Sequence, residues 1–351
     1  MTNKDNKLPF PRKTPAFRLK ILDNIILVII LGLAVHLFLP QIATLENSYK
    51  VAKNMSIWVI FLAVVSQFIS YLGSGYIFKS LVRLSKHSLS IFKSTMITMA
   101  SISFGMIAGG LIGTATMTYR LMKKEKISNE TAILAAIIPG LFNNIVLLLV
   151  STFGLIYLFF VHELSKFQLL SFIFTLTSII VIIGLIVWGL TKREKFTKVV
   201  LWVNQYWNKL HHKAFNPNKT TKWLMGLFQV ADVLIAGSWR DSLVGAVINT
   251  VFDILTIYLI FVASNNHIGI EILLIGYGLP LLLGRMAFII PGGVGVVESV
   301  MVGSYTALGV SNSAAVAVVL VYRLISFWLP LILGFIMMLI LQRKHKYLSS
   351  F

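Results

Sequence analysis

The sequence has no cysteine and very few charged residues. The absence of cysteine excludes disulfides, zinc–thiolate sites and cysteine nucleophiles. Charged residues make up only 12% of the chain and hydrophobic residues 57%, whereas soluble domains are about 25% charged. Several windows hold about twenty apolar residues, enough for a helix to cross roughly 30 Å of hydrocarbon. The composition therefore predicts an all-α polytopic membrane protein, a single domain over residues 1–351.

The sequence also lacks the short motifs of several enzyme classes. It has no Walker-A loop, no Gly-x-Ser-x-Gly elbow and no His-Glu-x-x-His pair, and its seven histidines have no metal-ligand spacing. We therefore expect no catalytic residue, no cofactor and no metal. The Lys and Arg residues, 31 against 12 Asp and Glu, lie mainly in short loops between apolar runs. This pattern is typical of cytoplasmic loops in membrane proteins and argues against a nucleic-acid partner.

Apolar runs predict about six full membrane spans. The first run, 21–39, is longer than a signal-peptide core and has no cleavage site, so we interpret it as a retained span. The basic flanks of the runs place both termini in the cytoplasm and the loop 40–55 outside. The other predicted spans are residues 56–78, 131–160, 169–190, 242–263 and 313–341.

Two further apolar runs are interrupted by glycine and do not fit a single crossing. The run 94–119 has basic loops on both sides, which favours a re-entrant hairpin from the cytoplasmic face. The alternative is one helix whose small residues pack against a neighbour. The run 271–309 starts and finishes outside by the same charge rule and breaks at Pro291–Gly295, which predicts a second hairpin from the opposite face. Broken backbone at membrane depth needs protein or a water-filled cavity around it.

The two predicted hairpins resemble each other at an offset of 183 residues. Ile107-x-Gly109-Gly110 matches Ile290-x-Gly292-Gly293, and Ile127-Ser128-Asn129 matches Val310-Ser311-Asn312. Because the hairpins enter from opposite faces, this predicts an inverted repeat, an arrangement common in secondary transporters. The alternative is chance similarity between glycine-rich helices. The predicted parts are residues 21–160 for the first half, 161–222 for a linking span with a basic segment, and 223–341 for the second half.

The segment 191–222 is strongly basic. Within it Phe196, Val200 and Val203 recur at helical spacing with lysines between them, which predicts an amphipathic helix on the anionic inner leaflet. A face against a partner protein is the alternative. Residues 223–239 are apolar but short, and we interpret them as an interfacial or partly inserted helix.

Four ionisable residues are predicted at membrane depth: Asp253, Arg285, Glu298 and Arg323. An isolated charge there costs about 2.5–3.5 kcal/mol, so two acids and two bases are expected to converge. They would either form a network that only holds helices together or form a site for a lipid headgroup. We favour the headgroup site, because intramembrane ionisable residues often mark transport pathways.

The residues after Pro291 suit an anionic headgroup. The helix that begins there presents free backbone N–H groups to a phosphate, and Arg285 or Arg323 would pair with the same phosphate. Glu298 would take a cationic amine of the headgroup. The remaining candidate substrate-binding residues are Gly292, Gly293, Gly295, Ser299, Tyr322 and Asp253 around the second hairpin, and Gly109, Gly110, Thr114, Thr116, Tyr119 and Arg120 around the first.

Four strings in the second half point to a family. They are Pro291-Gly292-Gly293-Val294-Gly295-Val296-Val297-Glu298, Leu308-Gly309-Val310-Ser311, Tyr322-Arg323-Leu324 and Phe327-Trp328-Leu329-Pro330. Together they resemble the membrane domain of the bacterial lysyl-phosphatidylglycerol synthase/flippase family. The resemblance implies a protein of the bacterial cytoplasmic membrane that moves aminoacylated phosphatidylglycerol between leaflets. Full-length members continue into a soluble aminoacyl-transferase domain, whereas this sequence stops at Phe351, so we do not carry over the synthase activity.

We therefore expect a lipid flippase that works by alternating access around the two hairpins. Its expected partners are membrane lipids, either an anionic phospholipid or an aminoacyl lipid, and a homo-oligomer or a separate synthase partner stays open. The alternatives are a membrane-embedded lipid-modifying transferase or its non-catalytic accessory subunit, and a scaffold whose buried charges only join helices.

Overall fold

The computed structural model describes residues 42–83, 87–107, 110–161, 166–210, 217–233, 235, 239–286 and 293–348, and this part of the chain is helical, without a β-strand. The predicted first span, 21–39, lies outside the described residues. The helices are α2 (Ile42–Lys53), α3 (Ile57–Arg83), α4 (Ile91–Ile107), α5 (Leu111–Lys124), α6 (Asn129–Val161), α7 (Lys166–Thr191), α8 (Arg193–Leu210), α9 (Pro217–Val233), α10 (Trp239–Ala263), α11 (Ile270–Met286), α12 (Val296–Ala307), α13 (Asn312–Arg323), the π-helix η4 (Leu324–Trp328) and α14 (Leu329–Leu348).

Four runs of described residues are long and apolar enough to cross a membrane: Ile57–Arg83, Asn129–Gly154, Trp239–Ala263 and Asn312–Leu341. Each coincides with a predicted span, and α7 covers the predicted span 169–190. The prediction of an all-helical, multi-pass membrane protein is confirmed. The segment 40–55, which was predicted as a loop, contains the helix α2 (Ile42–Lys53), and this helix packs against α13.

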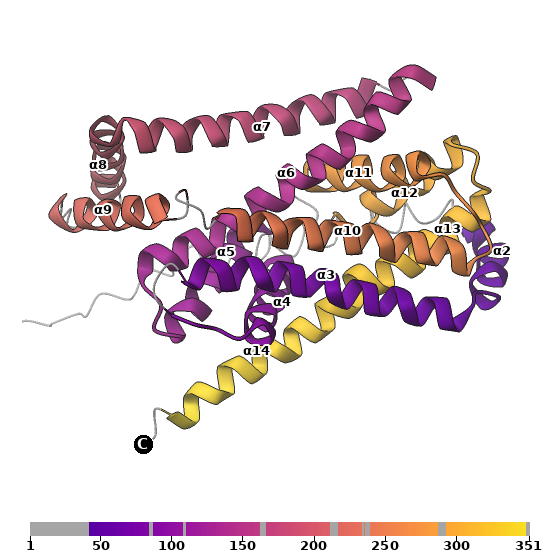
Figure 1. Ribbon diagram of the computed structural model, residues 1–351, viewed down its shortest axis with the longest axis horizontal. Helices are drawn as coiled ribbons and strands as arrows, with labels where there is room; N and C mark the ends of the chain where they lie inside the picture. The colour runs from indigo at the N-terminus through magenta and orange to yellow at the C-terminus, as the bar shows by residue number, and fades with distance from the viewer. Residues whose placement is uncertain are drawn as a thin grey trace, which may run out of the picture.

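The antiparallel pair α3 and α10 runs along the long axis of the molecule and forms its centre (Figure 1). Small residues bring the two backbones together: a Cβ at Gly73 would lie 2.8 Å from the carbonyl oxygen of Gly245. Ser66 Oγ donates to the carbonyl of Phe252 at 2.7 Å, and Asn249 Nδ2 donates to Ser70 Oγ at 2.9 Å. Close backbones with hydroxyl and amide contacts are how helices associate in lipid, where apolar burial supplies no driving force.

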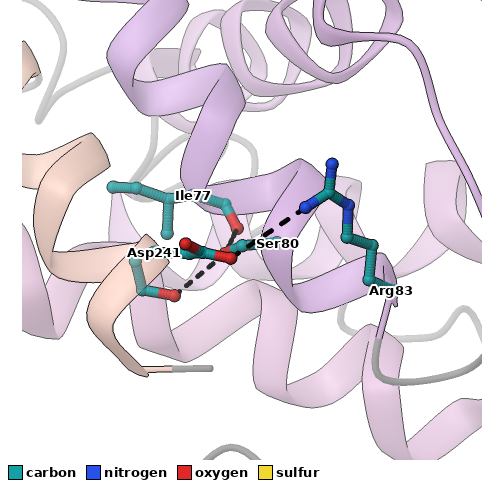
Figure 2. Close-up of polar contacts among 5 residues, drawn as sticks. Ile77, Ser80, Arg83 and Asp241 are labelled. Carbon is teal, nitrogen blue, oxygen red and sulfur yellow. Dashed lines mark hydrogen bonds and ion pairs between the residues drawn. The ribbon is translucent and has the colours of Figure 1, made fainter. Parts of the chain in front are cut away.

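A polar cluster joins this pair where α3 ends and α10 begins (Figure 2). Ser80 Oγ donates to the carbonyl of Ile77 at 2.7 Å and lies 3.0 Å from Ser242 Oγ. Arg83 and Asp241, both partly exposed, approach to 4.0 Å beside it. The exposed ion pair contributes little to stability, whereas the buried hydroxyl pair fixes the register of the two helices.

Two helical hairpins pack on either side of the central pair. The first consists of α4 and α5, joined at Gly110, and α4 also contacts α3 and α14. The second consists of α11 and α12, and α11 also contacts α6. They lie toward opposite ends of the molecule (Figure 1). One long helix from each half thus contacts the hairpin of the other half: α14 packs against α4, and α6 packs against α11.

Each hairpin has its own apolar core. Ile97, Met117 and Met122 belong to one cluster, which also takes in parts of α3, α6, α10 and α14. Met301 and Tyr305 belong to the other, together with residues of α3, α6, α10, α11 and α13. The outer surface is apolar as well, and Ile57 and Trp58 on α3 are 73% and 78% exposed. In water such a surface would drive association, so it fits contact with lipid.

Several local backbone features recur at the 183-residue offset. Gly110 and Gly293 have φ of 62° and 63°, and Lys126 and Gly309 have φ of 60° and 93°. The N–H of Ile127 donates to the carbonyl of Met122, and 183 residues later the N–H of Val310 donates to that of Tyr305. Helices α6 and α13 begin at Asn129 and Asn312, the same offset apart.

Helices α7, α8 and α9 lie to one side of this assembly (Figure 1). α8 covers Arg193–Leu210, as predicted for the basic amphipathic segment. Its Trp202 and Tyr206 stack on each other, exposed, with a centroid separation of 6.2 Å. α9 (Pro217–Val233) packs against α6 and α8. These two helices, the end of α3, the start of α10 and the end of α14 share one end of the molecule, whereas α2 lies at the other.

Candidate functional site

A buried ion pair joins the second hairpin to the last long helix. Glu298 lies in the first turn of α12 and Arg323 at the end of α13, and Arg323 Nε donates to Glu298 Oε1 at 2.5 Å. Their side chains are only 3% and 7% exposed. A charge-assisted contact of this kind is strong, and removing one partner would leave the other charge without compensation in a medium that solvates it poorly.

The second oxygen of Glu298 binds the start of its own helix. Glu298 Oε2 accepts the backbone N–H of Gly295 at 2.7 Å. Gly295 has φ of 84°, a conformation open mainly to glycine. The carboxylate therefore lies between a guanidinium and a helix N-terminus, both of which attract anions. This is the place where the sequence hypothesis puts a phosphate.

The Arg323 guanidinium also contacts an aromatic ring. Its Cζ lies 4.1 Å from the centroid of the Phe327 ring. Phe327 belongs to the π-helix η4, which separates α13 from α14. Single π turns inside helices are often found at functional sites.

Pro330 accounts for this π turn. Proline has no N–H and its ring crowds the carbonyl four residues earlier, here that of Ser326. Tyr71 of α3 supplies the missing donor, with its hydroxyl 2.7 Å from the Ser326 carbonyl oxygen. A cavity of about 30 Å³ lies beside this contact, lined by Tyr71, Ser103, Ser326 and neighbouring apolar side chains. It has room for about one or two waters.

Asp253 lies on α10 close to the same ion pair. Its Oδ2 accepts two hydroxyl groups, from Tyr277 of α11 at 2.7 Å and from Tyr322 of α13 at 3.1 Å. Arg323 is near enough to interact with its charge. Three of the four ionisable residues predicted at membrane depth, Asp253, Glu298 and Arg323, therefore converge. Nothing is described of the fourth side chain, that of Arg285.

Comparison with known proteins identifies the family. Residues 24–334 match the family model described as the lysylphosphatidylglycerol synthase TM region. The chain belongs to this family. The resemblance inferred from the motifs at 291–298, 308–311, 322–324 and 327–330 is thereby confirmed.

Relatives of this chain in the lysylphosphatidylglycerol synthase TM family are also membrane proteins. It is 25% identical to the UPF0104 membrane protein MJ1595 of Methanocaldococcus jannaschii over 347 residues, covering 93% of this chain and 97% of that protein. It is 24% identical to the UPF0104 membrane protein PH1989 of Pyrococcus horikoshii over 338 residues, covering 92% and 98%.

The first hairpin of this family member places its candidate residues in local contacts. Thr114 Oγ1 donates to the carbonyl of Gly110 at 3.0 Å and Thr116 Oγ1 to that of Ile112 at 2.7 Å. Tyr119 donates to Asn129 Oδ1 at 3.1 Å, at the start of α6. Arg120 is exposed at the end of the hairpin. These four side chains therefore make a separate group from the Glu298–Arg323 pair.

In the second hairpin, Gly293, Gly295 and Ser299 lie at the start of α12. The N–H of Ser299 donates to the carbonyl of Gly295 at 3.1 Å. Gly293 has φ of 63°, and a Cβ there would lie 3.1 Å from the Cα of Gly284 on α11, so glycine permits the close approach of the two arms. Three predicted positions, Gly109, Pro291 and Gly292, lie outside the described residues.

Three residues near Asp253 were missed by the sequence prediction: Gln67 and Tyr71 on α3 and Tyr277 on α11. Gln67 was visible as a lone amide in the apolar run of α3, but an amide in a span is as often a helix-packing contact. The two tyrosines have no sequence signal, because their role depends on Asp253 and Ser326 reaching them from other helices.

A larger pocket lies away from this cluster, between the start of α6 and helices α8 and α9. Its volume is about 690 Å³. Val200, Val203 and Trp223 give it apolar walls, and Glu130 and Lys222 add one charge of each sign. Two of the helices that line it, α8 and α9, lie at the end of the molecule where α3 and α14 also end (Figure 1).

Proposed function

We propose that this protein moves a phospholipid with a polar headgroup, of the phosphatidylglycerol or aminoacyl-phosphatidylglycerol type, between the leaflets of the cell membrane. The observation that carries this proposal is the position of the Glu298 carboxylate. It lies between the Arg323 guanidinium and the N–H of Gly295, so the protein holds an anion-binding site that one of its own carboxylates fills.

A lipid phosphate carries the same acceptor oxygens as that carboxylate. In the proposed cycle it takes over the donors of Arg323 and of the α12 N-terminus, because both favour an anion. Glu298 is then released toward an amine on the headgroup. With an aminoacyl headgroup, which carries the amine, each exchange pairs one positive with one negative charge, so no charge is left alone in the membrane.

Access to this pair requires movement, because Glu298 and Arg323 are almost fully buried. We propose that the hairpin α11–α12 moves relative to the rest of the bundle. We propose a corresponding movement for the hairpin α4–α5, at the opposite end of the molecule. The inverted repeat that this requires is supported by the matching φ values of Gly110 and Gly293 and of Lys126 and Gly309. It is also supported by the position of the two hairpins toward opposite ends of the molecule.

A disulfide between the hairpin and its neighbour tests the proposed movement. A Cβ at Gly278 of α11 would lie 3.3 Å from Cβ of Ser151 on α6. This is slightly less than the separation of about 3.5–4.5 Å in a disulfide, so the bridge forms after a small shift of the two helices apart. The chain has no native cysteine, so a Ser151→Cys/Gly278→Cys variant would form a single defined bridge. Ser80→Cys/Ser242→Cys is the matched control, because it bridges α3 and α10, which the proposal treats as fixed.

The assay follows fluorescent phosphatidylglycerol in proteoliposomes. We expect oxidation to stop lipid movement in the α6–α11 variant, reduction to restore it, and the control to move lipid in both states. Equal movement by the oxidised and reduced α6–α11 variant would contradict the proposed movement. Detection of a chemically altered lipid, with no movement by the wild type, would replace the flippase by a lipid-modifying transferase.

A further inference from the structure

Only one of the two carboxyl oxygens of Asp253 has a hydrogen-bond partner among the described residues. Both tyrosine hydroxyl groups go to Oδ2, whereas Oδ1 is buried and has no hydrogen-bond partner among the described residues. Gln67 of α3 and Asp253 of α10 each follow directly after a residue of one interhelical contact, in which Ser66 Oγ donates to the Phe252 carbonyl at 2.7 Å. Gln67 is only 5% exposed, and its Oε1 is likewise without a partner in the described part of the chain. Two buried acceptor atoms, Asp253 Oδ1 and Gln67 Oε1, are therefore unsatisfied in the same part of the α3–α10 interface.

Among the described residues, the cation nearest to Asp253 is Arg323, which Asp253 shares with Glu298. Arg323, on α13, is bound at short range to Glu298 of α12. The other titratable groups that face Asp253 are the hydroxyl groups of Tyr71, Tyr277 and Tyr322, on α3, α11 and α13. Arg285 is also on α11, but its side chain lies outside the described residues. The described groups thus contain two carboxylates and one guanidinium.

We propose that Asp253 is a proton-binding site that couples lipid movement to a proton gradient across the membrane. The inference rests on the proposed flippase function and names its coupling ion. In the resting state the proton is on Oδ1, and this O–H donates to Gln67 Oε1, which satisfies both buried acceptors with one hydrogen. No bond other than this O–H forms or breaks during the cycle.

The Gln67 amide suits both states of the carboxyl group. Its oxygen accepts from the neutral acid, and after a half turn its Nε2 donates to the carboxylate. The proton is released to water and is replaced from the other side of the membrane. The cavity of about 30 Å³ beside Tyr71 and Ser326 offers a place for the water that carries it.

The hydroxyl contacts favour a proton over a metal cation. Tyr277 and Tyr322 direct their hydrogens at Oδ2, so their oxygens are turned for donation and not for cation ligation. Hard cations need about six or more oxygen ligands, and the described residues contain no group of three or more acids or histidines that would hold one. A single proton needs only the Asp253–Gln67 pair.

The first test is independent of transport. Infrared spectra of the wild-type protein in phosphatidylglycerol–phosphatidylethanolamine vesicles at neutral pH are expected to contain the carbonyl band of a protonated carboxylic acid, absent in Asp253→Asn. The substitution keeps an oxygen for the two tyrosines and an N–H for Gln67, so it mimics the neutral acid. Asp241→Asn, at the exposed start of the same helix, is the control and should keep the band. A band that Asp253→Asn retains would overturn the proposal.

The second test measures coupling with fluorescent phosphatidylglycerol. For one proton per lipid, a gradient of one pH unit is expected to shift the leaflet distribution about tenfold in the wild type, and not at all in Asp253→Asn. Proton coupling would be refuted if lipid still moves in the wild type but the ratio of lipid between the two leaflets stays near one under the pH gradient. A response of this ratio to a sodium gradient instead would refute it as well. Neither result would contradict the proposed flippase function. Absence of lipid movement in the wild type would refute the flippase, and the infrared band would still decide whether Asp253 holds a proton.

Discussion

The Glu298–Arg323 pair offers the sharpest test of the proposed site. Glu298→Gln keeps an oxygen for the Gly295 N–H but removes the charge, so Arg323 is left buried with Phe327 as its close neighbour. Both side chains are less than a tenth exposed, so solvent screens the loss very little. Breaking a buried pair on one side costs about 3–5 kcal/mol, and we expect the variant to lose this much stability.

A double-mutant cycle separates the pair from each residue's other contacts. Arg323→Met leaves Glu298 as the unpaired charge and should also cost about 3–5 kcal/mol, whereas Glu298→Gln/Arg323→Met contains no charge and should recover much of that loss. Denaturant unfolding in detergent, followed by tryptophan fluorescence, gives the four free energies. Single variants that lose less than about 1 kcal/mol, with additive effects in the double variant, would refute the buried pair.

The remaining predictions concern the backbone, the central interface and the topology. Lys126→Gly should raise the free energy of unfolding by about 1 kcal/mol, because Lys126 has φ of 60°; no gain would argue against this turn. Gly73→Ala should cost about 1–3 kcal/mol, because the added Cβ would meet the backbone of Asn249 at 2.6 Å, whereas Gly184→Ala on α7 has open space and should cost nothing. In the cysteine-free chain, Ser311→Cys should react with an impermeant reagent from outside and Lys126→Cys only from the cytoplasm; reaction of both from one side would contradict the inverted repeat.

The long elements were predictable because their cause is local. An apolar run of span length has one stable form in lipid, a helix with its own backbone satisfied, and the runs 56–78 and 242–263 became α3 and α10. The turns at Gly110 and Gly293 were also predictable from local sequence, because both residues adopt a positive φ, which favours glycine. The helix in the segment 40–55 was missed because the segment is short and nearly neutral and lies between two apolar runs, whereas in the structure its helix α2 packs on α13.

The site was only partly predictable because its pairings are tertiary. The cost of a charge in lipid predicted that Asp253, Glu298 and Arg323 would meet, and they do. The same argument did not predict which of the two acids would form the ion pair with Arg323. It also did not predict that the Glu298 carboxylate would bind the helix N-terminus, where a phosphate was expected. The π turn before Pro330 was also absent from the prediction, because its freed carbonyl is satisfied from α3, by Tyr71.

The most direct measurement is lipid movement by the purified wild-type protein in proteoliposomes. Fluorescent phosphatidylglycerol in the inner leaflet is protected from an impermeant quencher added outside. If the protein is a lipid flippase, the protected fraction falls steadily in proteoliposomes and stays constant in protein-free vesicles. A protected fraction that stays constant in both would contradict the account.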